Sequence, residues 1–216
     1  MGRLARAAKI GLMVLGGWVA AQVAVRIWRR LFPAPVSPIV SPIFEAPLRE
    51  IGQPRHVTFR HIGLGPGMRV LEIGAGDGFY TCEAARLIGP EGRLTAVNSQ
   101  PRAAALLADR VHREGAANVE VRLAEATNLP FPDGTFDLAF LVTSLGEIAD
   151  KGRALRELRR VLKPNGRLSI TEAMADADYM LMAEVVGWAQ AVGFELVEQH
   201  GNALVYTLNF RSLFGP

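Results

Sequence analysis

Short apolar runs alternate with amphipathic stretches from about Gly67 to the end of the chain. Seven runs have the length and composition of strands, at 69–73, 94–97, 119–123, 136–142, 167–171, 194–199 and 203–209. Apolar positions at helical spacing predict helices over 80–88, 102–114, 154–162 and 179–192. This alternation predicts an α/β fold: a doubly wound, mostly parallel seven-stranded sheet with helices on both faces. The last two strands flank His200-Gly201-Asn202, which predicts a C-terminal antiparallel hairpin.

The N-terminal segment has a different pattern, because residues 10–25 contain no charged side chain and are apolar on every helical face. Extended through Trp28, a helix over residues 10–28 would rise ~28 Å, close to the thickness of a bilayer's hydrocarbon core. We therefore expect residues 1–31 to form a membrane-anchoring helix that contacts the bilayer through residues 10–28. A signal peptide cleaved near Val19-Ala20-Ala21 and an ordinary buried helix are the alternatives.

Residues 32–53 contain Pro33, Pro35, Pro38 and Pro42, which disfavour a helix and favour an extended backbone. Because this segment is also rich in apolar side chains, we expect it to be a linker that serves as a lid over a ligand-binding site in the domain that follows. The remaining residues, 54–216, form the predicted α/β domain.

Charge and cysteine content narrow the possible partners. Residues 1–30 hold six basic residues and no acid, whereas the whole chain has a net charge of only +3, so the remaining residues are net acidic. A net-acidic domain argues against nucleic-acid binding, and basic residues beside an apolar run favour anionic lipid headgroups. The single cysteine, Cys82, excludes a disulfide framework and a cysteine-rich metal site, so we expect no metal.

The strongest chemical signal is the stretch from Val70 to Thr81, VLEIGAGDGFYT, in which an apolar strand leads into a glycine turn and then a helix. Glycines allow a tight turn and a close approach of the backbone to a ligand. The spacing is G-x-G-x-G, and Glu72 stands two residues before the first glycine. A carboxylate there would repel a pyrophosphate but suits a cationic ligand, which argues against an NAD-dependent dehydrogenase.

At this point the chain resembles the class I S-adenosylmethionine-dependent methyltransferases over about residues 54–210. The resemblance rests on LEIGAGDG at residues 71–78, on LPFPDGTFD at 129–137 and on LKPNG at 162–166, in the family's order. It implies that S-adenosylmethionine is the cofactor. It also implies that Glu72, Gly74, Gly76 and Gly78 line the cofactor's methionine end.

Further cofactor contacts follow from the resemblance at the ends of the next strands. Asn98, followed by Ser99, stands where the family usually has an acid that binds both ribose hydroxyls; an amide can still bind a hydroxyl, but without charge assistance. Glu125 and Ala126 occupy the adenine-binding positions. Thr143 ends the fourth strand, which places it near the transferred methyl group. A helix cap or turn is the alternative role for Asn98, and a solvated loop acid is the alternative for Glu125.

The sequence names no confident catalytic base. A methyl transfer needs an acceptor held in line with the S–CH₃ bond, and a base only where the acceptor carries a proton. His61 and Glu147 are weak candidates, together with His56 and His200. Each of these histidines also fits an ordinary surface or capping role.

The N-terminal segment is the best indication of the acceptor, because attachment to a bilayer raises the effective concentration of membrane-resident substrates. We expect a lipid acceptor, either a phospholipid headgroup amine or a prenylated quinone, with the catalytic domain on the cytoplasmic side of the membrane. Methylation of a soluble small molecule and a degenerate cofactor-binding scaffold remain as alternatives. Arsenic methylation would need several thiols, and the segment after the fourth strand lacks an N/D-P-P-Y/F motif of nucleic-acid amino methylation.

Overall fold

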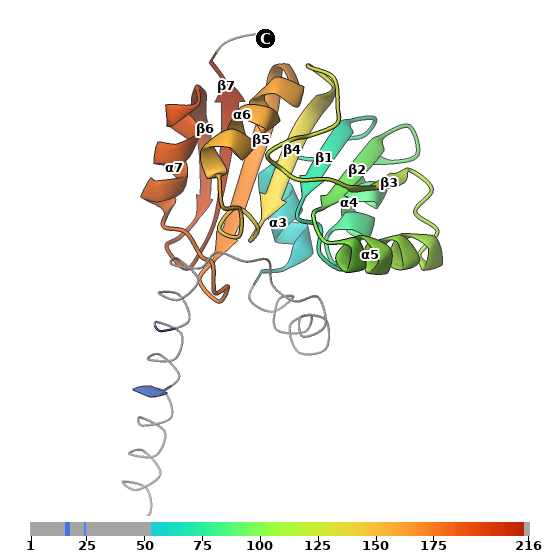
Figure 1. Cartoon of the computed structure of the whole chain (residues 1–216), viewed down its shortest axis with the longest axis horizontal. Helices are drawn as coiled ribbons and strands as arrows, with labels where there is room; N and C mark the ends of the chain where they lie inside the picture. The colour runs from blue at the N-terminus through green and yellow to red at the C-terminus, as the bar shows by residue number, and fades with distance from the viewer. Residues whose placement is uncertain (1–15, 18–23, 25–52, 214–216) are drawn as a thin grey trace, which may run out of the picture.

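A computed structural model of the chain describes residues 16–17, 24 and 53–213 (Figure 1). Its centre is one seven-stranded sheet with the strand order β3-β2-β1-β4-β5-β7-β6. The strands are β1 (Arg69–Ile73), β2 (Arg93–Asn98), β3 (Val119–Leu123), β4 (Phe136–Val142), β5 (Leu162–Ala173), β6 (Phe194–Gly201) and β7 (Val205–Ser212). The first five are parallel to one another, whereas β7 is antiparallel to both β5 and β6. The predicted mixed sheet and its C-terminal hairpin are therefore confirmed.

Five helices pack on the sheet: α3 (Arg55–Ile62), α4 (Thr81–Ile88), α5 (Pro101–Arg113), α6 (Lys151–Val161) and α7 (Met182–Ala191). In Figure 1, α6 and α7 lie in front of the sheet and α3 lies behind it. The alternation of side chains along β1 explains the two layers, because Leu71 packs in the α6 and α7 core and Val70 in the α3 and α4 core. The predicted doubly wound arrangement is thus present.

Helix α3 is the one described helix that the hydrophobic pattern did not predict. Only Phe59 and Ile62, among its large apolar side chains, are fully buried, so its amphipathic pattern is too short to recognise. The helix follows Pro54 and ends at Gly63, whose φ is +78°. It lies against β5 and β7, and its first residue lies near the turn after β1.

Strand β5 starts five residues earlier than predicted, and the difference has a clear cause. Phe136 of β4 pairs with Leu162, but Leu138 pairs with Arg167, so the residues between them form a bulge. Asn165 adopts a positive φ of 66° inside this bulge. The LKPNG motif over residues 162–166 therefore forms an interruption within a longer strand. Asp137 fixes it by accepting a 2.6 Å hydrogen bond from Lys163 Nζ.

Two connections meet at the carboxyl end of the parallel strands. The β4–α6 connection contains Gly146, and the β5–α7 connection contains Asp178. A Cβ atom at Gly146 would overlap the Asp178 carbonyl oxygen. Tyr206 on β7 donates a 2.7 Å hydrogen bond to the Met180 carbonyl and holds the second connection against the sheet. The close approach of the two backbones therefore requires glycine at position 146.

The N-terminal predictions fall almost entirely outside the described residues. Of the predicted membrane helix, Gly16, Gly17 and Ala24 are described, and all three are helical and exposed. Within residues 16–17, 24 and 53–213, no helix combines the length and apolar character needed to cross a bilayer. The predicted lid at 32–53 also lies outside the described residues, except for Gln53.

We predict that Gly146→Ala lowers the melting temperature by several degrees. The added methyl group forces the two connections apart, and overpacking of this kind costs about 1–3 kcal/mol, which corresponds to roughly 2–4 °C per kcal/mol. Gly187→Ala in α7 is the matched control, because nothing lies within 4 Å of its Cβ position. That control should raise the melting temperature slightly through helix propensity. Equal melting temperatures for the two variants would contradict the proposed close approach.

Candidate functional site

The glycine turn joins β1 to α4 at the carboxyl edge of the sheet. Gly74, Gly76 and Gly78 all have positive φ angles, of 73°, 57° and 85°. A Cβ atom on Gly74 would lie 2.5 Å from Ser144 Cβ, and one on Gly78 would lie 2.6 Å from Leu107 Cδ1. Nothing lies within 4 Å of the same position on Gly76. The outer glycines are therefore needed for packing, whereas Gly76 exposes bare backbone to open space.

Glu72 lies at the carboxyl end of β1 and is only 3% exposed. Burial raises the pKa of its carboxyl to about 8; the nearby Asp77 charge adds to this shift, and the Thr81 side chain partly offsets it. Its Oε2 atom is buried and has no hydrogen-bond partner among the described residues. A buried, unsatisfied carboxyl oxygen is costly and is typical of a functional position.

Asn98 ends β2 and directly faces the glycine turn. Its Oδ1 accepts a 3.0 Å hydrogen bond from Gly76 N, and its Nδ2 donates a 3.1 Å hydrogen bond to Gly76 O. The side chain is buried, whereas the next residue, Ser99, is exposed. The structure thus brings Asn98 to the predicted site, where its side chain holds the turn.

The predicted adenine-binding residues follow β3, the strand beside β2. Glu125 is exposed and forms an isolated bridge with Asn128, and Ala126 is buried. The amide of Ala124 donates a 3.0 Å hydrogen bond to Asn98 O, which joins this segment to the end of β2. Glu125 and Ala126 therefore lie at the same edge of the sheet as the glycine turn.

The end of β4 supplies the third part of the site. Thr143 has a positive φ of 49°, which is unusual for a residue other than glycine and indicates local strain. Ser144 Oγ donates a 2.9 Å hydrogen bond to Ile73 O and ties this end to β1. Glu147 is half-buried in the connection that follows. Thr143 therefore lies beside the glycine turn, on the side away from β2, and Glu147 lies in the connection that follows.

His61 lies elsewhere in the molecule. Its ring stacks on that of His200, with centroids 4.5 Å apart and the planes 6° from parallel. Burial, then the charges of His200 and Arg60, lower the pKa of His61. Its carbonyl accepts a 2.7 Å hydrogen bond from Asn209 on β7, which pairs with the middle of β5. The structure therefore does not bring His61 together with the glycine turn.

Two features near the site were missed by the sequence analysis. The Arg55 guanidinium lies 4.7 Å from the centroid of the Phe79 ring, so the start of α3 reaches the glycine turn. Glu172, near the end of β5, is only 1% exposed, and burial raises the pKa of its carboxyl well above the ordinary value. The signal for Glu172 was present, because an acid ends an apolar strand there, as Glu72 does in β1.

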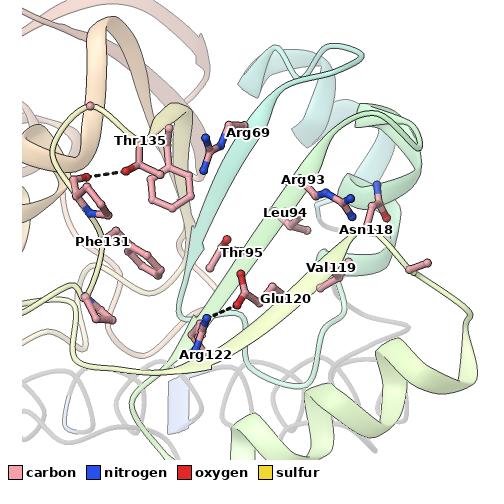
Figure 2. Close-up of a pocket in the computed structure, with 15 residues that line it drawn as sticks. Arg69, Arg93, Leu94, Thr95, Asn118, Val119, Glu120, Arg122, Phe131 and Thr135 are labelled. Carbon is pink, nitrogen blue, oxygen red and sulfur yellow. Dashed lines mark hydrogen bonds and ion pairs between the residues drawn. The ribbon is translucent and has the colours of Figure 1, made fainter.

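A cavity of about 800 Å³ lies over one face of β1, β2 and β3 (Figure 2). Arg69 and Arg93, the first residues of β1 and β2, line it together with Arg122 near the end of β3, which pairs with Glu120. The β3–β4 connection contains no helix and forms the other wall through Phe131. None of the predicted cofactor-binding residues lines this cavity. Within the described part of the chain, no cluster of three potential ligands could hold a metal ion.

Comparison with known proteins identifies the domain. Residues 71–170 match the protein family described as a methyltransferase domain. The chain is 40% identical over 116 residues to the ubiquinone/menaquinone biosynthesis C-methyltransferase UbiE of Teredinibacter turnerae. It is 37% identical over 119 residues to the UbiE protein of Ectopseudomonas mendocina. These alignments cover 53% and 55% of the chain and 47% and 46% of the relatives, so the chain spans about half the length of the curated relatives it matches.

Solved structures share the fold over more of the chain. A SAM-dependent methyltransferase from Aquifex aeolicus has a TM-score of 0.77 and 24% identity, covering 82% of this chain and 100% of its own. The [4+2]-cyclase SpnF has a TM-score of 0.65 and 22% identity, covering 74% of this chain and 80% of its own. The second likeness shows that this fold also occurs in a cyclase. The fold alone therefore does not identify the reaction, which has to be argued from the residues of the site.

We predict that Glu72→Gln removes a pH-dependent loss of stability. The raised pKa means that the folded state holds a proton that the unfolded chain releases near the ordinary carboxyl pKa of 4.5. The stabilisation that the protonated Glu72 carboxyl gives to the folded wild type is complete below that pH, and it is lost as the pH rises through about 8. The difference in melting temperature between the variant and the wild type should therefore grow in the variant's favour from pH 5 to pH 9. A difference that stays constant over this range would contradict the buried, proton-retaining carboxyl.

The residues at the carboxyl edge fit S-adenosylmethionine. The buried Glu72 carboxyl offers an oxygen without a partner among the described residues, and Gly76 leaves open space over bare backbone. A buried carboxyl beside the glycine turn suits a cationic ligand better than a pyrophosphate. Sequence match and fold agree: residues 71–170 match a methyltransferase domain, and the chain shares its fold with an S-adenosylmethionine-dependent methyltransferase of known structure.

Proposed function

We propose that the whole chain is a methyltransferase that transfers the methyl group of S-adenosylmethionine to a ring carbon of a prenylated quinone in its reduced form. The main support is the identity of 40% and 37% to two proteins named as ubiquinone/menaquinone biosynthesis C-methyltransferases. The apolar N-terminal segment adds support, because such an acceptor resides in a membrane. Together these observations favour a quinone over a phospholipid headgroup.

The proposed reaction needs little from the protein beyond binding and orientation. The cofactor supplies a sulfonium-bound methyl group that is already activated for transfer. An electron-rich carbon of a hydroquinone ring forms the new C–CH₃ bond while the S–CH₃ bond breaks and its electrons return to sulfur. The ring carbon then loses its proton, and S-adenosylhomocysteine is the second product. Because a phenolic hydroxyl activates the ring, a base of moderate strength suffices.

The residues of the carboxyl edge have distinct roles in this proposal. The bare backbone at Gly76 lets the cofactor approach closely, and Glu72 faces its cationic end. Ser99, Glu125 and Ala126 hold the nucleoside side, and Asn98 holds the glycine turn. Thr143 lies near the transferred methyl group, and Glu147 remains a candidate base beside it, whereas the position of His61 makes it a poor one.

Membrane attachment completes the proposal. Residues 10–28 would bind the bilayer, with the domain on the cytoplasmic side, and residues 32–53 would act as the lid. Attachment confines enzyme and acceptor to the same surface and raises their effective concentration. Arg55 lies at the glycine turn and follows the proposed lid closely in sequence, so a lid formed by residues 32–53 would begin near this turn.

We predict that Gly76→Arg abolishes binding of S-adenosylhomocysteine, as measured by isothermal titration calorimetry. The new side chain would fill the open space over the turn. Gly115→Arg is the matched control: its φ is +65°, and nothing lies within 4 Å of its Cβ position, so the backbone strain is similar, but it lies at the end of α5. The control should bind like the wild type. Binding retained by Gly76→Arg would refute the placement of the cofactor.

The acceptor is tested with radiolabelled S-adenosylmethionine and two substrates in vesicles: a reduced prenylated quinone with one unsubstituted ring carbon, and phosphatidylethanolamine. We expect label in the quinone, in a methyl group that resists hydriodic acid, which cleaves methyl ethers, because it is bonded to carbon. Label in the phospholipid alone would overturn the quinone proposal in favour of a headgroup amine. Label in neither, in a protein that binds the cofactor, would favour a soluble acceptor or a scaffold.

Deleting residues 1–31 tests the anchor separately. We expect the shortened protein to remain folded, to bind S-adenosylhomocysteine as tightly as the full chain, and to stay in the supernatant after vesicle sedimentation. Its rate with the vesicle-borne quinone should fall by about tenfold or more, because the effective concentration is lost. A shortened protein that sediments with vesicles as the full chain does would exclude residues 1–31 as the anchor.

A further inference from the structure

Asn98 uses both polar atoms of its side chain on one residue. The Oδ1 atom accepts from Gly76 N at 3.0 Å, and the Nδ2 atom donates to Gly76 O at 3.1 Å. The side chain is 5% exposed, so these two bonds are largely shielded from water. Asn98 is thus bonded to both backbone polar groups of the one glycine in the turn that faces open space.

The reciprocal pair requires an amide. A carboxylate accepts hydrogen bonds but donates none, so an aspartate at position 98 could bond Gly76 N–H but would place negative charge against Gly76 O. Shielded hydrogen bonds hold a backbone more firmly than exposed ones, and a glycine such as Gly76 has little conformational preference of its own to hold it in place. The amide therefore fixes the turn before any ligand arrives.

The same choice changes what the sugar of the cofactor meets. A hydrogen bond from a sugar hydroxyl to a carboxylate is charge-assisted and about twice as strong as one to a neutral amide. The Asn98 amide is neutral, and one lone pair of Oδ1 and one N–H of Nδ2 already bond to Gly76. A hydroxyl near the end of β2 can therefore bond only to the remaining lone pair or N–H, in a hydrogen bond without charge assistance.

We propose that Asn98 is a positioning residue that preorganises the glycine turn, and that in exchange this protein discriminates only weakly between ribose and deoxyribose forms of its cofactor. The inference rests on the proposed cofactor site. It deepens that proposal in two ways. The geometry of the glycine turn sets how tightly the cofactor binds, and residue 98 sets how strongly the deoxyribose form of the cofactor is discriminated against. Asn98→Asp should therefore reverse both properties, since it loosens the turn and offers the sugar a charged acceptor.

Calorimetric titration with S-adenosylhomocysteine and its 2′-deoxy analogue, combined with melting temperatures of the ligand-free proteins, tests the proposal. The wild type should bind the two ligands with affinities that differ by less than about fivefold, and Asn98→Asp by more than about tenfold. Both Asn98→Asp and Asn98→Ala should melt below the ligand-free wild type. Asn118→Asp is the matched control, because Asn118 Nδ2 also donates to backbone carbonyls, those of Ala85 and Gly89. It should melt lower but keep the wild-type ratio.

Two results would overturn the inference: a wild-type ratio above about fivefold, or a ratio that is unchanged in Asn98→Asp. An unchanged melting temperature in both Asn98 variants would overturn the positioning role. If the wild type binds neither ligand, the proposed function itself fails. The melting temperatures of the ligand-free variants still decide the positioning role in that case.

Discussion

The backbone of the β1–α4 turn, which passes three glycines with positive φ, is the constraint on which the rest of the site depends. Each glycine has different surroundings. A side chain on Gly74 would collide with Ser144, which follows β4, and one on Gly78 would collide with Leu107 of α5, whereas Gly76 faces open space. Side chains at the first two positions would separate the strands and helices that form the edge. The bare backbone at the third is what a ligand can approach.

Much of the fold could be predicted from the sequence because its strands are parallel and buried. The strands over Arg69–Ile73, Val119–Leu123 and Phe136–Val142 have the predicted bounds. The misses occurred where a local pattern is short or depends on a distant partner. Helix α3 has too few apolar positions to show a period, and the bulge in β5 depends on Lys163 reaching Asp137 on β4.

The candidate site could be predicted in part for the same reason. The glycines and Glu72 were recognisable because a strand, a turn and a helix follow one another in sequence. The pairing of Asn98 with Gly76 was not, because it joins residues 22 positions apart on two strands. The stacking of His61 on His200 likewise depends on how α3 crosses the hairpin. Residue type alone left both histidines as possible bases.

The carboxyl edge of the sheet and the cavity over β1, β2 and β3 differ in electrostatic character, and this difference separates their possible ligands. Glu72 and Glu172 are buried at the carboxyl edge, and burial raises the pKa of both carboxyls. Arg69, Arg93 and Arg122 line the cavity on one face of the sheet, where Arg122 pairs with Glu120 (Figure 2). A cation bound beside Glu72 would stabilise the charged form of its carboxyl, whereas Arg69 and Arg93 favour an anionic ligand in the cavity.

The most direct measurement of the central claim is the backbone amide NMR spectrum of the isotope-labelled protein during titration with S-adenosylhomocysteine. The account predicts that the signals of Gly74, Gly76 and Asn98 shift first and most strongly, since they surround the open face of the turn. The signals of Asn118 and Glu120 in the cavity over β1, β2 and β3 should stay in place. Shifts confined to that cavity, with the glycine signals unchanged, would contradict the account.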